Sequence, residues 1–425
     1  MLDIKLIREK PDLVKKAIKD RGLKLDIDAL LVLDEEKRNL LKEVEGLQYQ
    51  KNVLSDQIAQ KMLKDKKDVQ NFVEESKVLS QKIDKLRVRV EEIEPKVANF
   101  MLNIPNIPDN SLPIGLTAEN NKVVRSWGKP LEYNPKLRNH LELVEHLGIV
   151  DLARAAKITA SNFILFMGQG ARLERALYNF MLDLHTKKHG YKEVFPPFLV
   201  NRASMTGTGQ LPKLEEDMYR LKDDDLFLIP TAEVPVTNIH RDDVFKEEEL
   251  PVYYTAYTAC FRREAGSYGK DTRGLTRVHQ FDKVELVKFV QPETSYNELE
   301  SLVENAEEVL QLLELPYRVI MLCTGEISFS ASKCYDLEAW APASKSWLEV
   351  SSCSNFSDFQ ARRANIKFRS AASKKLEYVH TLNGSGVALA RTVIALLEVH
   401  QTPQGTVRIP KALIPYMDGV TELKP

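Results

Sequence analysis

Apolar residues recur every seven positions in two stretches of the first hundred residues. The first series, with its interleaved positions, is Leu30, Leu33, Leu40, Val44, Leu47, Leu54 and Ile58. The second is Phe72, Leu79, Ile83, Leu86, Val90, Ile93, Val97 and Phe100. Heptad spacing predicts two long helices that pack along one seam. The polar segment 61–68 between them suits a turn, so the pattern predicts an antiparallel helical hairpin. Each helix of about 30 residues would be about 45 Å long.

The hairpin is flanked by two segments of different character. Residues 1–27 predict a short helical lead-in, with Pro11 suited to a helix start. Residues 103–116 contain three prolines and interrupt the heptads, which indicates a domain boundary. From about residue 117 short strands and medium helices alternate, as in an α+β fold. We therefore expect an N-terminal helical domain over 1–105 and an α+β domain over 106–425.

A helix followed by a strand is predicted from Gly170. Its apolar stripe consists of Leu173, Leu177, Phe180, Met181 and Leu184. Gly190 ends the helix, and the strand over 191–195 runs into Pro196 and Pro197. Two prolines remove two donors from a strand ladder, so this strand is expected at a sheet edge or an interface.

Composition narrows the class of protein. The chain has 425 residues and a formal net charge of −1, so nucleic acid would have to be held by local basic patches. Its four cysteines form no CxxC pair, which argues against a zinc site and a disulfide framework. The N-terminus lacks the apolar run of a signal peptide, and there is no apolar stretch of 18 residues. We expect a soluble cytoplasmic protein.

The segment 261–285 predicts a strand, a glycine-containing loop and a second strand. Alternation places Arg262 and Glu264 on one face of the first strand. It places Arg277, His279, Phe281 and Glu285 on one face of the second. Arginines bind phosphate through bidentate hydrogen bonds, an aromatic ring stacks on a nucleobase, and a carboxylate accepts a hydrogen bond from an amino group. This face therefore suits a nucleotide. The alternative is a solvated amphipathic hairpin.

Three further segments carry candidate chemistry. Thr231, Ala232 and Glu233 lie between two prolines, where a polar turn is the alternative interpretation. Alternation places Glu349 and Ser351 on one side of a strand, with Ser352 after a bend; such oxygens suit Mg²⁺, or form a hydrogen-bonded cluster. Arg391 is the only charge between Gly386 and Leu397, so it requires an anion, either Glu398 or another internal carboxylate, or a phosphate.

These motifs resemble those of the class II aminoacyl-tRNA synthetases, and most closely those of the seryl-tRNA synthetase family. The sequences FRREAG and GLTRVHQF resemble its second motif, the helix and strand from Gly170 the first, and the segment from Asn383 to Arg391 the third. The resemblance covers the whole chain. It implies an antiparallel sheet domain flanked by helices, behind a coiled-coil arm that holds tRNA.

The resemblance also implies roles for individual residues. L-Serine would be bound by Thr231, Ala232, Glu233, Glu285, Asn383 and Ser385. ATP would be bound by Arg262, Arg263, Glu264, Arg277, Val278, Phe281, Glu349, Val350, Ser351, Ser352 and Arg391. Arg262, Arg277 and Arg391 would be catalytic, and Glu349 and Ser352 would hold Mg²⁺. Candidate tRNA contacts are Lys61, Lys64, Lys66, Lys67, Lys82, Lys85, Arg87 and Arg89. His279 is expected to have a packing role only.

The predicted function is that of a serine–tRNA ligase. Serine would attack the α-phosphorus of ATP, and the 3′ end of tRNA(Ser) would then attack the seryl-adenylate; tRNA(Sec) is a further substrate where such a tRNA exists. The resemblance implies a homodimer, with tRNA bound across subunits. Two alternatives are a paralogue that loads a carrier protein and a non-enzymatic RNA-binding or coiled-coil protein. The retained arm disfavours the first, and the three arginines disfavour the second. From periodicity alone, the arm could also be a dimerisation coiled coil.

Overall fold

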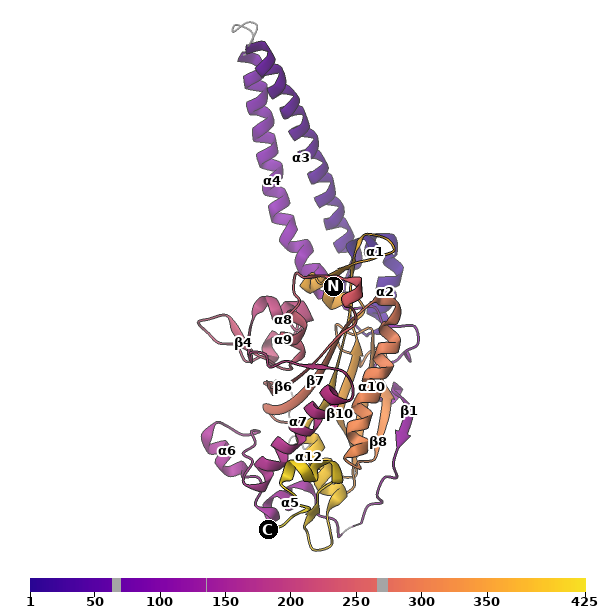
Figure 1. The fold of residues 1–425 in the computed structure, drawn as a ribbon. Coiled ribbons are helices and arrows are strands. Elements are labelled where there is room, and N and C mark those ends of the chain that lie inside the picture. The colour runs from indigo at the N-terminus through magenta and orange to yellow at the C-terminus, as the bar shows by residue number, and fades with distance from the viewer. Residues whose placement is uncertain (63–69, 135, 266–273) are drawn as a thin grey trace. The chain divides into compact units, whose positions relative to one another are not determined.

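The computed structural model describes residues 1–62, 70–134, 136–265 and 274–425 (Figure 1). The chain divides into two compact units. One comprises residues 2–19 and 23–104, and the other comprises residue 1, residues 20–22 and residues 105–425. The predicted domain limits of 1–105 and 106–425 stay a prediction.

The first unit is helical. Its elements are α1 (Ile4–Glu9), α2 (Pro11–Asp20), α3 (Ile27–Met62) and α4 (Gln70–Asn103). The two long helices run side by side in opposite directions (Figure 1), as the heptads predict. Heptad residues such as Leu54, Ile83 and Ile93 are buried along the seam. Ion pairs of 2.7 Å between Lys37 and Glu94 and 2.9 Å between Arg89 and Glu36 join their exposed sides. The predicted turn falls mostly on residues 63–69, outside the described residues.

The second unit is built on an eight-stranded sheet with the order β1-β8-β9-β10-β13-β7-β6-β2. Its strands are β1 (Lys122–Trp127), β2 (Lys192–Glu193), β6 (Val252–Phe261), β7 (Gln280–Val290), β8 (Tyr317–Met321), β9 (Lys333–Ala341), β10 (Ser346–Asn355) and β13 (His380–Ala388). All neighbours pair antiparallel except β2 and β6, which are parallel. The predicted α+β fold with a mainly antiparallel sheet is confirmed.

Smaller sheets and helices complete this unit. The smaller sheets contain β3 (Leu199–Asn201) with β4 (Leu226–Leu228), β5 (Val244–Lys246) with β11 (Lys367–Arg369) and β12 (Leu376–Tyr378), and β14 (Val407–Arg408) with β15 (Glu422–Leu423). The α-helices are α5 (His140–Leu147), α6 (Leu152–Ile158), α7 (Gln169–Lys187), α8 (Arg202–Thr208), α9 (Glu233–Asn238), α10 (Ser295–Leu312), α11 (Phe359–Ala364) and α12 (Leu389–His400).

Helices α7, α10 and α12 pack against the central sheet and form its main core. Alternation along β7 shows how the sheet serves two purposes. Val284 and Leu286 belong to that core, whereas Phe281, Lys283 and Glu285 line a cavity on the opposite face. Packing of one face of β7 in the core thus fixes the strand whose other face lines the cavity.

The segment after α7 differs in length from the prediction. Lys192 and Glu193 alone form β2, instead of the five residues expected, because Pro196 and Pro197 follow so closely. The strand nevertheless lies at the edge of the sheet, as expected. Across the described ranges, none of the helices is long and apolar enough to cross a membrane.

Candidate active site

A cavity of about 440 Å³ opens on the polar face of the central sheet. Its lining comes from segments far apart in sequence: the 208–214 segment, Thr231 and Glu233, the two sides of the 261–285 hairpin, β10, β13 and the start of α12. The size suits a ligand larger than an amino acid alone.

Three arginines line this cavity: Arg262, Arg277 and Arg391. Arg262 directly follows β6, and its Nε donates to the carbonyl oxygen of Pro230 over 3.3 Å. Its guanidinium carbon lies 5.1 Å from the centre of the Phe281 ring. A cation and a flat ring are thus offered side by side, which suits a nucleotide with its phosphates.

The predicted strand placement around Arg277 is wrong. Strand β7 begins at Gln280, so Arg277 and His279 precede it, while Phe281 and Glu285 share its cavity face. Arg262 extends the ladder by one bond, from its backbone N–H to the carbonyl of His279 at 2.9 Å. Arg277 instead reaches the cavity from the loop and donates to Glu264 Oε2 over 3.0 Å.

A β-bulge between Glu349 and Ser351 corrects the prediction for β10. Glu349 pairs with Glu338, and Ser352 pairs with Asp336, two residues away on β9, so Glu349 and Ser352 share a face. Ser351 turns to the other side, where its hydroxyl donates to the carbonyl of Ser385 over 2.6 Å. The strand continues through Ser352, and the bend expected before Ser352 is this bulge. The pKa of Asp336 is raised mainly by burial and, as the second cause, by the nearby charge of Glu349.

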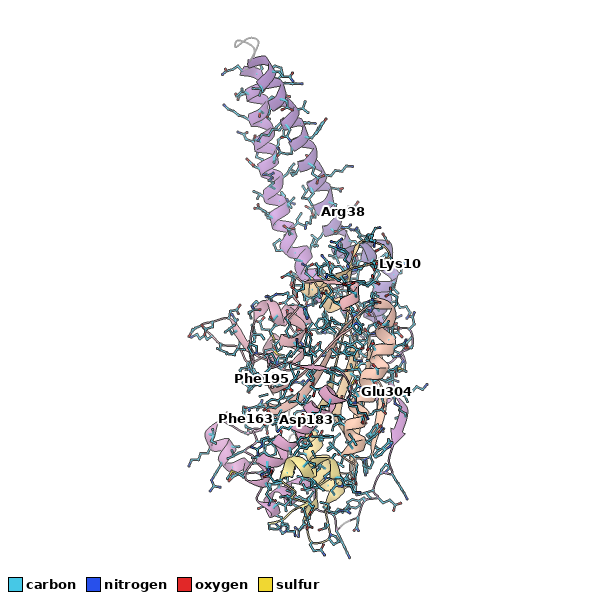
Figure 2. The ribbon with its side chains drawn as sticks, in the orientation of Figure 1. Lys10, Arg38, Phe163, Asp183, Phe195 and Glu304 are labelled. Carbon is cyan, nitrogen blue, oxygen red and sulfur yellow. The ribbon has the colours of Figure 1, made fainter. Side chains whose placement is uncertain are left out.

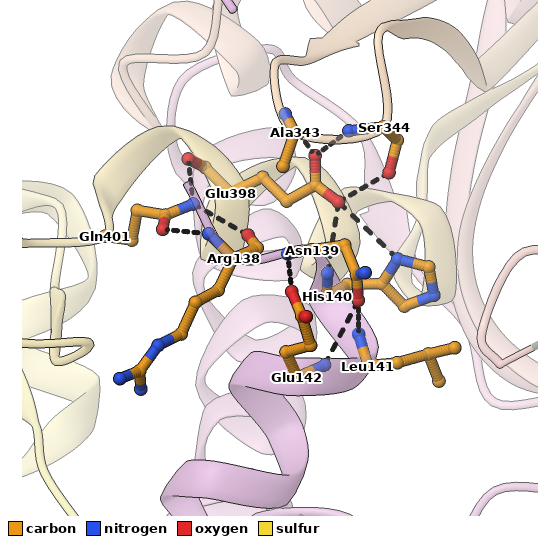
Figure 3. Close-up of polar contacts among 9 residues, drawn as sticks. All are labelled: Arg138, Asn139, His140, Leu141, Glu142, Ala343, Ser344, Glu398 and Gln401. Carbon is orange, nitrogen blue, oxygen red and sulfur yellow. Dashed lines mark hydrogen bonds and ion pairs between the residues drawn. The ribbon is translucent and has the colours of Figure 1, made fainter. Parts of the chain in front are cut away.

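Arg391 is not paired with Glu398. Its Nη1 lies 3.4 Å from Glu349 Oε2 and donates to the Glu349 carbonyl over 3.0 Å, and its Nε donates to the Thr276 carbonyl over 3.1 Å. Glu398 is occupied elsewhere (Figure 3), where it accepts from the backbone of His140 and Ala343 and from Ser344. The carboxylate beside Arg391 is thus another internal one, Glu349, and both residues line the cavity.

Away from the three arginines, the cavity ends in buried polar residues. The Thr231 hydroxyl donates to Glu285 Oε2 over 3.1 Å, and Lys283 Nζ lies 2.5 Å from the same oxygen. Glu233 begins helix α9 and accepts from Gln360 over 2.6 Å. Burial, and next the charge of Glu285, raise the pKa of Glu233 to about 7.

Comparisons with known proteins agree with this geometry. Residues 1–108 match the seryl-tRNA synthetase N-terminal domain, and residues 216–400 match the class II tRNA synthetase core domain shared by the G, H, P, S and T enzymes. The serine–tRNA ligase of Thermodesulfovibrio yellowstonii is 53% identical over 98% of this chain and 99% of its own length. That of Trichlorobacter lovleyi is 54% identical over the whole of both chains. The chain belongs to the seryl-tRNA synthetase family.

A solved structure gives the same result. The seryl-tRNA synthetase of Pyrococcus horikoshii, crystallised with ATP, superposes with a TM-score of 0.93 at 39% identity over the full length of both chains. These relatives confirm the predicted family, the ligase class and the serine–tRNA ligase function. ATP-dependent chemistry follows from membership of a class II synthetase family.

Most residues predicted for the synthetase site line the one cavity. Of the described candidates, Ala232 and Arg263 do not line it. Ala232 is fully buried, and Arg263 uses its backbone N–H to reach the carbonyl of Asp217 over 3.0 Å. On the arm, Lys82, Lys85, Arg87 and Arg89 are exposed on α4, with Arg89 paired to Glu36. Lys64, Lys66 and Lys67, and the side chain of Lys61, lie outside the described residues.

Lys283 and Gln210 are among the polar residues of this synthetase cavity that sequence reasoning missed. Lys283 had a usable signal, because it alternates with Phe281 and Glu285 on β7. Gln210 follows Gly209, whose φ of +95° ends helix α8, and its amide lies 3.5 Å from Glu233 Oε2. A loop residue of this kind has no periodicity from which its neighbours could be predicted.

Proposed function

We propose that this cavity activates L-serine with ATP and then transfers the seryl group to the 3′ end of tRNA(Ser). The observation that carries the proposal is that two arginines of the 261–285 hairpin, Arg391 of the distant helix α12 and two buried carboxylates line the same cavity. ATP carries about four negative charges near neutral pH, so several cations must meet it. The carboxylates at the other end suit an amino group.

The nucleotide end is assigned as follows. Arg262 holds the α-phosphate, where charge grows as the serine carboxylate attacks and pyrophosphate leaves. Arg277 and Arg391 hold the outer phosphates. Phe281 stacks on the adenine, and Glu264, fixed by Arg277, accepts from the adenine amino group. Catalysis then comes from positioning and charge stabilisation, without a protein nucleophile.

Mg²⁺ fits the face formed by Glu349 and Ser352. A carboxylate and a hydroxyl share one side of β10, and hard oxygen donors with several retained waters are what Mg²⁺ prefers. Glu349 and Ser352 would hold the ion, which would supply charge neutralisation for the ATP phosphates. Among the described residues no group of three His, Cys, Asp or Glu side chains is arranged to hold a metal.

The serine end combines charge with hydrogen bonding. Glu285 accepts from the ammonium or the hydroxyl, and Ser385, its cross-strand neighbour on β13, pairs with the hydroxyl. Thr231, Glu233 and Asn383 complete the polar wall. A site built to satisfy a hydroxyl discriminates strongly against alanine, because its buried polar groups would be left unpaired. Threonine would be rejected sterically.

Residues 1–105 are assigned to tRNA binding and residues 106–425 to catalysis. The exposed lysine and arginine side chains on α4 support contacts with tRNA phosphates along the arm. tRNA(Sec) is a further substrate where it exists, because contacts of this kind carry little sequence information. A dimerisation role for the arm is less supported, since its heptads are used within the hairpin itself.

A homodimer is supported by the edge of the sheet. Strand β2 leaves that edge open, and Phe195, two residues beyond it, is 75% exposed (Figure 2). An exposed aromatic at an open edge favours a second copy as its cover. The tRNA would then lie across the two subunits. The assigned location is the cytoplasm, where tRNA, ATP and serine meet.

Pyrophosphate exchange with each of the twenty amino acids tests the activity. Exchange that depends on serine, followed by serylation of tRNA(Ser), is expected. Activation of another amino acid, or transfer only to a carrier protein, would favour the paralogue alternative. No exchange with any amino acid would favour a non-enzymatic role.

A further inference from the structure

Lys283 is a buried cation at the serine end to which the function proposed above gives no role. Its side chain extends from β7 beside Glu285, and the residue is 6% exposed. Its Nζ lies 2.5 Å from Glu285 Oε2 and donates to Thr231 Oγ1 over 2.8 Å. A buried ammonium is costly unless anions and acceptors meet it, so its presence inside a substrate cavity needs an explanation.

Lys283, Thr231 and Glu285 form a closed triangle. The Thr231 hydroxyl accepts from Lys283 and donates to Glu285 Oε2 over 3.1 Å. Both partners therefore bind the same carboxylate oxygen. The rotamer of Glu285 is fixed from one side, and within the described part of the chain its Oε1 keeps lone pairs for a ligand that enters the cavity.

The charges at this end also have a simple balance. Apart from Arg262, which the proposed function assigns to the α-phosphate, ionised Glu233 and Glu285 with protonated Lys283 give a net charge of −1, equal and opposite to the ammonium of an amino acid. Without Lys283, two buried carboxylates would face each other, and each would disfavour ionisation of the other. A protonated carboxyl would then offer an ammonium no charge.

We propose that Lys283 is a positioning residue for the amino-acid substrate, which keeps Glu285 ionised and correctly oriented to accept from serine. This deepens the proposed serine site and rests on it. Burial raises the pKa of Glu285, and the adjacent Lys283 opposes that rise more strongly than any other group. The remaining charged and titratable groups that face Glu285 are Glu233, Arg262, Cys260 and Cys353. Both thiols have pKa values raised by burial and stay neutral.

The test is serine-dependent pyrophosphate exchange by Lys283→Met between about pH 6.5 and 8.5, with KM for serine and for ATP measured at each pH. For the wild type we expect Glu233 to set the pH dependence of KM for serine, which should level off at about pH 8, above the Glu233 pKa of about 7. At pH 7 we expect KM for serine to be about tenfold higher in Lys283→Met than in the wild type. As the pH is raised, KM of the variant should continue to fall up to about pH 8.5, because Glu285 without Lys283 ionises only at higher pH. KM for ATP should change less than about twofold, since uniform damage to the cavity would move both.

Lys288→Met is the matched control. Lys288 lies on the same strand, is 1% exposed and donates to Glu298 Oε2 over 2.8 Å, away from the cavity. The Lys288→Met substitution should lower the stability of the protein, while the pH dependence of KM for serine should stay as in the wild type. Lys283→Arg restores the charge and should return the wild-type shape of the profile.

The role of Lys283 would be overturned if KM for serine in Lys283→Met had the pH dependence of the wild type. If Lys283→Met fails to fold, the role would be overturned by a KM for serine in Lys283→Arg that continues to fall up to about pH 8.5. A wild-type enzyme without serine-dependent exchange would instead refute the proposed site itself. The two failures are therefore distinguishable.

Discussion

Replacing Glu233 with glutamine should remove a pH dependence of stability from the unliganded enzyme. The side chain is buried, and burial with the nearby charge of Glu285 raises its pKa from 4.5 to about 7. Gln360 donates to its Oε1 over 2.6 Å, and a glutamine oxygen can accept the same bond. The substitution therefore changes charge with little change in packing.

The sign and size of the effect follow from linkage. Because the folded-state pKa is raised, the folded state holds the proton more tightly, and the stability this provides is lost as pH rises through about 7. Full loss amounts to about 3 kcal/mol, because each tenfold difference in proton affinity between the folded and unfolded states contributes about 1.4 kcal/mol. Between pH 6 and pH 8 the loss is about 1.3 kcal/mol.

The assay is urea unfolding followed by tryptophan fluorescence at pH 6, 7 and 8. All three tryptophans, Trp127, Trp340 and Trp347, lie in the unit that contains the cavity, so the arm does not contribute to the signal. The free energy of unfolding of Glu233→Gln, relative to the wild type, should rise by about 1.3 kcal/mol from pH 6 to pH 8. Saturating serine should reduce that difference, because its ammonium compensates the carboxylate. Parallel stability profiles for the two proteins would refute the buried, proton-holding Glu233.

The remaining predictions concern activity and assembly. Arg262→Ala should reduce kcat/KM for serine-dependent pyrophosphate exchange at least about tenfold, since charged hydrogen bonds contribute about 1.5–3 kcal/mol each; Arg263→Ala, outside the cavity lining, should change it little, and equal effects would contradict the assignment. Glu349→Gln should raise the Mg²⁺ concentration for half-maximal exchange, and an unchanged Mg²⁺ titration would argue against a metal site there. Deletion of residues 28–98 should weaken tRNA charging and spare exchange; equal loss of both would count against the arm as the tRNA-binding element. Sedimentation at micromolar protein should give a dimer that Phe195→Asp weakens, whereas a wild-type monomer would contradict the open-edge argument.

Sequence patterns predicted the parts of this molecule that depend on local periodicity. Heptad spacing predicted two helices packed along one seam, and the polar segment between them favoured an antiparallel hairpin. The two prolines after β2 predicted a sheet edge or an interface. Arg262, Arg277 and Arg391 could be assigned to one site because the resemblance to the class II motifs implied it and because a polyphosphate needs several cations.

Features that depend on non-local geometry could not be predicted. The bulge that places Glu349 with Ser352 is a register shift against β9, which strict alternation in one strand cannot reveal. The partner of Glu398 is the backbone around His140 and Ser344, more than fifty residues away in both cases. The bond from Gln360 to Glu233 likewise depends on two short helices, α9 and α11, that only the tertiary fold brings together.

The most direct test of the account is a crystal structure with serine and a non-hydrolysable ATP analogue. The account predicts that the guanidinium groups of Arg262, Arg277 and Arg391 all contact phosphate oxygens of the one bound nucleotide, with Phe281 against its adenine. A triphosphate bound beyond the reach of any of these arginines would contradict it.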